Sequence, residues 1–437
     1  MLLRATRLRL RRGLMRGQAP HRRCLSDATA GAACPMAYRY RAADLAASQL
    51  SAGDGSAHTL FVVGGLYGNL SALAAIEALA ARERPGRGKK VSVVFNGDFH
   101  FFDADPHDFC EINRRVLPHR PSAPLANAGP RADVAAALAA INAGRAAGRA
   151  DADAGGSAGD RESRPDVLRQ TEGGVMEVVA TAGNIELAVS GGAAGAAGCG
   201  CDYPAYVSRG VVQRSDEIVR QLGAVASECE TPQALSSLSS LPLFATFRVG
   251  SVRVGVIHGD PEMLSGWSFG VEFMSPPDAA LRAALGCSHE AVTSRSQVED
   301  WFRQAEVDVF ACTHTCLPYA QRFVGAGRPR GGGAGGVERG DGLIFNNGSA
   351  GMANFEDTRW GLITRISEDL TPPPGSVYGC ELAGPEGGKG VRVDAVKVPF
   401  DYAAFTEVRV SVVSCACACA CAWMRAGTVE CKLRKSL

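Results

Sequence analysis

Short runs of apolar, β-branched residues recur along the chain, and each run is followed by a turn rich in Gly, Asn, Asp, His or Thr. Runs this short and this uniformly apolar are typical of strands that are buried on both faces of a sheet. The predicted strands cover residues 60–63, 91–95, 176–180, 252–257, 307–311 and 343–345. The pattern therefore predicts a largely buried sheet with polar turns at the strand ends.

Apolar residues at helical spacing lie between several of these strands. They recur every three or four positions within 70–81, 211–222 and 298–304, which indicates amphipathic helices. A repeated order of strand, polar turn and helix indicates an α/β fold. Ligands of such folds collect just beyond the carboxyl ends of the strands. The polar residues that follow each strand are therefore the first candidates for a site.

One carboxylate, one amide and two imidazoles each follow a different predicted strand by one to four residues: Asp98, Asn184, His258 and His314. Neighbouring glycines permit the tight turns that would direct such side chains to one edge. Each residue alone has an ordinary structural interpretation, because Asp and Asn cap helices and a single His is often a hydrogen-bonded structural residue. The four together predict a site for one divalent Mn, Fe or Zn ion.

The order of these motifs resembles that of the calcineurin-like metallophosphoesterases. The resemblance rests on Gly97-Asp98, Gly183-Asn184-Ile185-Glu186, His258-Gly259, Thr313-His314-Thr315 and a closing Asn346-Asn347-Gly348-Ser349. It runs from about residue 57 to residue 366, apart from an insertion. It implies an α/β fold: a metallophosphoesterase-like β-sandwich flanked by helices, with the metal-site edge at the C-terminal ends of the strands. In the family, two metals about 3.5–4 Å apart share a carboxylate and prepare water for in-line attack on phosphorus.

The chain departs from the family pattern in one half of the implied metal pair. The resemblance places one metal on Asp98, Asn184, His258 and His314. The positions of the other metal are taken by Gly65, Tyr67, Asp98 and Cys316. The family's leaving-group acid corresponds to Ile185. The resemblance therefore implies a divergent subgroup with one altered half-site and one metal ion per chain.

Several nearby residues are candidates for the missing functions. Cys316 is a candidate thiolate ligand, and a small buried apolar residue is the other interpretation. His100 is a candidate general acid, and a place in a solvated loop is the alternative. Tyr67 and Asn69 are candidates for substrate positioning, although Tyr67 also has the size to fill the altered half-site. Asn184 is assigned to catalysis as well as to metal binding.

The implied function is metal-dependent hydrolysis of phosphate esters with a reduced metal centre. The alternative is a non-catalytic phosphate- or nucleotide-binding protein on the same fold, because one half-site and the acid are missing. The glycine-rich turn at 64–69 matches neither the dinucleotide-binding nor the P-loop spacing, so a nucleotide cofactor is not favoured. The expected partner is a small phosphorylated ligand or phosphate ester, and the oligomeric state stays open.

Composition and charge narrow the classes of partner. The 437 residues are 46% hydrophobic and 21% charged, as in ordinary soluble globular proteins. A formal net charge of +1 provides no basic field for nucleic acid. No apolar run reaches the roughly 18 residues that predict a membrane span. We therefore expect neither nucleic-acid binding nor a membrane-spanning helix.

The first 25 residues differ sharply from the rest. They contain eight arginines and no acidic residue, which is typical of an organelle transit peptide. Without these eight, 38 basic residues face 45 acidic ones, so the remainder is mildly acidic. Arg23-Cys24-Leu25-Ser26 resembles a mitochondrial processing site and predicts cleavage before Ser26 and a mitochondrial location. A plastid location is an alternative, as is a cytoplasmic one if the N-terminus is an extension of the gene model.

The remaining chain divides into a domain at 36–400 and a low-complexity Cys/Ala tail at 401–437. The domain carries an insertion at about 119–168 whose Ala, Gly, Arg and Asp composition predicts a surface loop. Fifteen cysteines are scattered through a chain long enough to build its own core. Disulfide frameworks belong mainly to small secreted domains. We therefore expect free cysteines and no disulfide framework.

Overall fold

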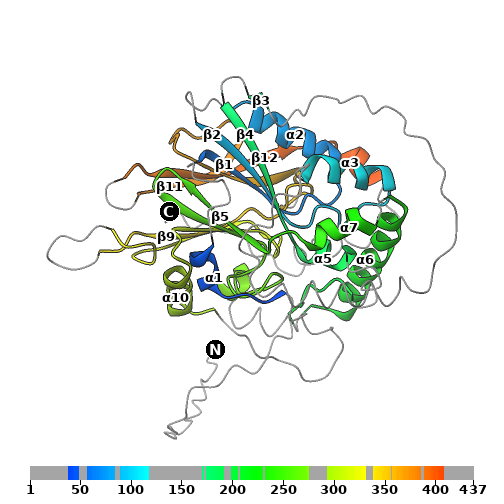
Figure 1. Ribbon diagram of the computed structural model, residues 1–437, viewed down its shortest axis with the longest axis horizontal. Helices are drawn as coiled ribbons and strands as arrows, with labels where there is room; N and C mark the ends of the chain where they lie inside the picture. The colour runs from blue at the N-terminus through cyan, green and yellow to red at the C-terminus, as the bar shows by residue number, and fades with distance from the viewer. Residues whose placement is uncertain are drawn as a thin grey trace, which may run out of the picture.

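The computed structural model of the protein describes residues 38–48, 57–83, 89–117, 170–171, 174–190, 198–204, 207–229, 232–274, 293–330, 338–355, 357–384 and 388–407. The predicted transit peptide, the insertion at 119–168 and the tail beyond residue 407 lie outside these residues. The described chain is a mixed α/β protein with a large sheet flanked by helices, as the hydrophobic pattern predicts (Figure 1).

One run of strands is centred on β1. In spatial order its strands are β3 (Gln170–Thr171), β4 (Gly174–Thr181), β2 (Lys90–Asn96), β1 (Ala57–Val63), β10 (Trp360–Ser367), β12 (Val391–Pro399) and β11 (Ser376–Leu382). Strands β1, β2 and β4 are parallel, whereas β10, β12 and β11 pair antiparallel. Every residue of β2 except Lys90 is buried, which agrees with its mostly apolar sequence.

A second run of strands is centred on β6 and β7. In spatial order its strands are β5 (Phe244–Val249), β6 (Val252–Ile257), β7 (Val309–Cys312), β9 (Gly342–Asn346) and β8 (Tyr319–Phe323). Strands β6, β7 and β9 are parallel, and the two outer strands are antiparallel to their neighbours. The first and second runs are joined by a single residue pair, Ala57 of β1 with Val249 of β5.

An apolar core lies between the two runs. It contains Leu60 and Val62 of β1, Val254 of β6, Phe345 of β9 and Val393 of β12, each with no more than 1% of its surface exposed. Side chains from both runs therefore contribute to one shared apolar core.

Helices cover the outer faces of the two runs (Figure 1). Those that share a core with the first run are α2 (Leu70–Ala81), α3 (Pro106–Val116), α5 (Asn184–Ser190), α6 (Arg209–Cys229) and α7 (Pro232–Ser239). Those that pack on the second run are α1 (Ala42–Ala47) and α10 (Arg295–Ala305). Two short helices complete the described chain, α8 (Val271–Met274) and α11 (Tyr402–Glu407).

The helix boundaries follow from capping. Helix α2 has the predicted bounds, because the Asn69 side chain accepts a hydrogen bond from the Ala72 backbone N–H at 3.0 Å and begins the helix there. Ser294 caps α10 in the same way. Glu306, in the left-handed conformation at φ 51°, ends α10. Helices α6 and α10 are both longer than the predicted segments.

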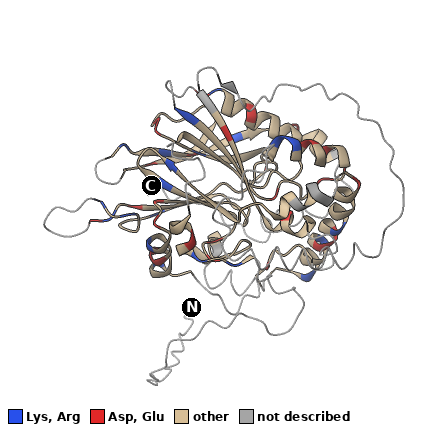
Figure 2. Cartoon of the chain, viewed as in Figure 1, with Lys and Arg blue, Asp and Glu red and all other residues tan. Residues whose placement is uncertain are grey.

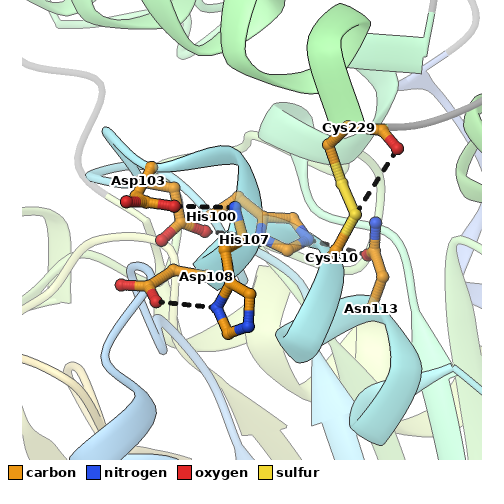
Figure 3. Close-up of a disulfide and its surroundings, with 8 residues drawn as sticks. His100, Asp103, His107, Asp108, Cys110, Asn113 and Cys229 are labelled. Atoms are coloured by element: carbon orange, nitrogen blue, oxygen red, sulfur yellow. Dashed lines mark hydrogen bonds and ion pairs between the residues drawn. A yellow bond between two sulfur atoms is a disulfide. The ribbon is translucent and has the colours of Figure 1, made fainter.

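Two features correct the sequence-based picture. Cys110 on α3 and Cys229 at the end of α6 form a disulfide with Cα atoms 6.1 Å apart (Figure 3), so the expectation of free cysteines throughout is wrong. Cysteine counts do not reveal that α3 and α6 lie side by side. The fold also continues past residue 400, because Phe405 of α11 is 6% exposed in a cluster with Tyr67 and Phe102.

Charged residues of both signs are interleaved over α3, α6 and α10 (Figure 2). This agrees with the small formal net charge of +1. Among the described residues, no helix is both long enough and apolar enough to cross a membrane.

Candidate metal centre

The four predicted ligands converge at the carboxyl ends of parallel strands. Asp98 follows β2, Asn184 opens α5 after β4, His258 follows β6, and His314 follows β7. Donor atoms of Asp98, His258 and His314 all lie within 4.8 Å of one another. All four residues are buried, with exposures between 0% and 7%. The sequence-based site is therefore one compact, water-poor cluster.

The Nε2 atom of His258 lies close to one donor atom of each of the other three residues. It is 3.4 Å from Oδ2 of Asp98, 3.2 Å from Oδ1 of Asn184 and 3.2 Å from Nδ1 of His314. Four donors placed tetrahedrally around an ion at about 2.0–2.1 Å lie about 3.3–3.4 Å from one another. The observed spacing around His258 therefore fits one divalent ion.

Hydrogen bonding determines which atoms face each other in the cluster. Nδ1 of His258 lies 2.8 Å from the backbone carbonyl of Asn96, and because a carbonyl only accepts, Nδ1 carries the proton. When the ring is neutral, Nε2 presents a lone pair. Asn184 turns its amide oxygen toward that lone pair because its Nδ2 donates to the Cys199 carbonyl at 2.9 Å. Together with Asp98, these lone pairs require a positive charge between them, either a proton or a cation.

Two other polar atoms of the cluster have no hydrogen-bond partner among the described residues. They are Oδ1 of Asp98 and Nε2 of His314, and both are buried. A buried polar atom without a partner costs about 1–3 kcal/mol, so native structures rarely keep one without a reason. The donor types and these unpaired atoms fit a divalent metal ion.

Burial and mutual contacts set the protonation of the cluster. Burial alone would raise the pKa of Asp98, but the adjacent His258 imidazole holds that pKa below its ordinary value. Burial would lower the pKa of His258, and the Asp98 carboxylate raises it instead. Burial, and then the nearby His258, lower the pKa of His314 to about 3. An ionised Asp98 and a neutral His314 are the forms that bind metal.

Glu186 connects the turns that carry two of the ligands. Its carboxylate accepts hydrogen bonds from the backbone N–H groups of Asp98, Phe99 and Gly183, each at 2.8 Å. The residue is completely buried, and burial, followed by the charge of Asp98, raises its pKa. One carboxylate thus fixes the turn after β2 against the turn after β4.

Backbone strain gathers at the same place. Tyr67, Asp98 and Cys316 adopt φ values of 55°, 57° and 57°, a left-handed conformation that non-glycine residues seldom adopt. Such strain persists where the surrounding contacts impose it, and it is common at functional sites. Gly183 is required for space, because a β-carbon there would lie 2.5 Å from Oδ1 of Asp98.

Two residues at the positions that the sequence analysis assigns to a second metal form a hydrogen-bonded pair. Oη of Tyr67 and Sγ of Cys316 are 2.8 Å apart. Burial raises the pKa of Cys316 to about 12, and it raises that of Tyr67 well above its ordinary value. Both side chains are therefore neutral at neutral pH, and Gly65 has no side chain to contribute. In this state the half-site offers neither a thiolate nor a phenolate.

A cavity of about 120 Å³ lies beside the cluster. Asp98 and His314 border it, whereas His258 and Asn184 do not. Most of the wall is aromatic or aliphatic: Tyr67, Phe101, Phe102, Ile185, Tyr203, Val211, Trp267, Leu317 and Met352. The described residues that line this wall include no Lys or Arg.

The aromatic residues of the wall form two groups, each attached to the site. Trp267 meets the His314 ring edge to face at 5.3 Å and lies 5.8 Å from the Tyr203 ring. The other group is built on Tyr67, whose ring lies 5.9 Å from Phe101 and 5.4 Å from Phe102. Flat apolar surface is therefore available on two parts of the cavity wall.

His100 and Asn69 lie outside this wall. Nδ1 and Nε2 of His100 are 2.7 Å from Asp103 and 2.8 Å from Asn113, and the ring stacks on Phe109 at 3.9 Å (Figure 3). Asn69 caps α2 and donates to the Gly351 carbonyl at 2.8 Å. Their placement gives them roles in holding a loop and a helix, and it does not support proton transfer by His100 or substrate contact by Asn69.

The sequence-based site omits Glu186 and most of the cavity wall. The sequence could have identified Glu186 as a site residue, because it ends the Gly183-Asn184-Ile185-Glu186 motif. The sequence indicates Phe101 and Phe102 less clearly, as two adjacent aromatic residues shortly after Asp98. The remaining wall residues come from segments far apart in the chain, where no spacing pattern marks them.

Comparison with known proteins gives weak structural likenesses. No family model and no curated protein matches the chain. A metallophosphoesterase from Sphaerobacter thermophilus is similar over 83% of this chain and 100% of its own, at 13% identity and a TM-score of 0.37. A hypothetical protein from Pyrococcus horikoshii OT3 is similar over 82% and 96%, at 11% identity and a TM-score of 0.36. A single mutant of Vps29 from Entamoeba histolytica is similar over 77% and 98%, at 11% identity and a TM-score of 0.24.

Proposed function

We propose that this protein is a metal-dependent hydrolase of phosphate esters, a divergent calcineurin-like metallophosphoesterase with a β-sandwich fold and one divalent Mn, Fe or Zn ion per chain. The ion would be held by Asp98, Asn184, His258 and His314. One observation carries the proposal. Three donor atoms lie 3.2–3.4 Å from the Nε2 lone pair of His258, in a cluster that needs a positive charge and borders a cavity.

The chain's own groups have distinct roles in this proposal. A divalent ion here would supply Lewis-acid chemistry, polarising a phosphoryl oxygen and making a water molecule more acidic. Asp98 and His314 reach the cavity and so face the reacting phosphorus. His258 and Asn184 hold the ion from the buried side, each fixed by a backbone carbonyl through its other polar atom. The aromatic wall excludes bulk water.

The test joins metal content to turnover. Purified protein should contain one transition-metal ion per chain by elemental analysis, and it should hydrolyse an aryl phosphate ester in a way that a chelator abolishes. His258→Gln should remove both the ion and the activity. His107→Gln is the matched control, since the side chain of His107 is 87% exposed on α3. Activity that survives in His258→Gln, or in metal-free protein, would refute the proposal.

The altered half-site favours a second candidate function. The hydrogen bond between Tyr67 and Cys316 joins two positions that the family resemblance assigns to a second ion, which suits a non-catalytic protein that binds a phosphate-containing ligand beside one metal. That function predicts one ion per chain and saturable binding of a phosphate ester, with no turnover of either an aryl monoester or an aryl diester.

A further inference from the structure

We infer that the cavity selects phosphodiesters with flat aromatic substituents, carrying one negative charge, over phosphate monoesters, which carry two. This inference rests on the proposed metal site and names the substrate class for it. It follows from the charges and surfaces that border the cavity.

The charge count of the site matches one anionic charge. Two positive charges on the ion and one negative charge on Asp98 leave at most one positive charge, because a hydroxide formed from the activated water would lower the sum further. Among the described residues of the wall, Asp98 is the only acidic one, and no Lys or Arg adds to the positive side. Glu186 lies outside the wall, and any negative charge on it disfavours a dianion further. Because a buried charge without a partner is costly, a diester monoanion fits and a monoester dianion leaves one charge unbalanced.

The shape of the wall matches the two organic arms of a diester. Trp267 with Tyr203, and Tyr67 with Phe101 and Phe102, form two groups of flat rings that are tilted against one another within each group, and Trp267 contacts the proposed ligand His314 directly. Aromatic rings bury large apolar surfaces and favour stacked or edge-to-face partners. A monoester has one organic arm and uses one of these groups only.

Hydrolysis of such a diester requires water as its only co-reactant. The oxygen of water forms a bond to phosphorus, and the bond from phosphorus to one ester oxygen breaks. The departing alkoxide takes one proton of the water, and the other remains on the monoester product. That product loses its proton near neutral pH, because its second pKa is about 6. The new dianion is the species that the wall binds poorly, so release of product is favoured.

Binding and turnover test the inference together. The probes are diphenyl phosphate and phenyl phosphate, titrated into metal-loaded protein at pH 8 by calorimetry, and the 4-nitrophenyl diester and monoester for turnover. We expect diphenyl phosphate to bind at least about tenfold more tightly, and kcat/KM to favour the diester by at least as much. Equal or tighter binding of phenyl phosphate would overturn the inference and leave the proposed hydrolase standing.

A variant that adds one positive charge to the cavity wall tests whether the charge of the wall sets the preference for diesters. Leu317 lines the cavity and is partly exposed, so Leu317→Lys should narrow the diester preference by about tenfold by improving phenyl phosphate binding. Val324→Lys is the control, since Val324 is 69% exposed and does not line the cavity. An unchanged preference in Leu317→Lys would show that charge does not set selectivity. Selective binding of diphenyl phosphate without any turnover would instead refute the hydrolase and keep the selectivity.

Discussion

A single carboxylate holds together the backbone of the candidate site. The two oxygens of Glu186 accept three backbone N–H groups, and two of these belong to the turn that carries Asp98. Residues behind the direct ligands of a metal usually determine how accurately the ligands are aimed. Glu186 is in that position although it never reaches the cavity.

Replacing Glu186 with Gln should weaken metal binding by about 10–100-fold. A Gln amide has one oxygen where Glu has two, and its NH₂ group would face a backbone N–H. Calorimetric titration with Mn or Zn measures the effect. Glu217→Gln on α6 is the control, because its side chain is 48% exposed. Equal affinity in the two variants would show that Glu186 is not a positioning residue.

Substitutions of Tyr67 or Cys316 should leave metal binding nearly unchanged, in contrast to the substitution of Glu186. Because both side chains are neutral and bonded to each other, Cys316→Ser and Tyr67→Phe should each keep one ion per chain, with affinity changed by less than about threefold. Elemental analysis and metal titration check this. Loss of the ion in Cys316→Ser would make the thiol a ligand, and two ions per chain would mean that the second half-site is intact.

Whole elements differ in how well the sequence predicts them. Strands β2, β6 and β9 each contain a short run of buried apolar residues, and helix α2 is bounded by its cap, so pattern alone finds them. The hydrophobic pattern does not predict strands β10 and β12, because each contains a buried charged residue. Arg365 of β10 is 3% exposed and pairs with Glu83 at 2.7 Å, and Asp394 of β12 is fully buried beside Arg392. A charged residue breaks the apolar run, and for Arg365 only the folded chain shows the partner, which lies 282 positions away in the sequence.

Helix α11 tests where the domain ends. Phe405 packs against Tyr67, Phe102 and Met352, so Phe405→Ala should lower the free energy of unfolding by about 3 kcal/mol, the lower end for a buried Phe. Urea unfolding measures the loss, and Phe405→Leu should restore most of it. If Phe405→Ala is as stable as the wild-type protein, α11 adds nothing to the stability of the fold and the domain ends at residue 400, as predicted from the sequence.

At the scale of the molecule, the candidate site spans both runs of strands. Asp98 and Asn184 follow strands of the first run, and His258 and His314 follow strands of the second, yet only Ala57 and Val249 pair the runs directly. The order of motifs along the sequence predicts that these four residues lie together. It does not predict the cavity, because Tyr203, Trp267 and Met352 come from loops that share no periodic pattern.

An ion at this position would therefore clamp the two runs together. With free metal at about 100 times its dissociation constant, binding stabilises the folded state by about 2.7 kcal/mol, so chelation should lower the melting temperature by about 5 °C. Differential scanning calorimetry with and without chelator measures the shift. His258→Gln should melt at the chelated temperature in both conditions. An identical melting temperature for wild-type protein with and without chelator would argue against a resident ion.

The disulfide between Cys110 and Cys229 closes a ring that contains the whole segment between α3 and β3. The two sulfurs join positions 119 residues apart, and the segment 119–168 lies inside that ring. A backbone cut within the ring yields two polypeptides but one molecule. If a specific protease site is introduced at about residue 150, the cleaved protein should run as one species on a denaturing gel without reductant and as two after reduction. After such a cut, the disulfide between Cys110 and Cys229 is the covalent bond that holds the two fragments together.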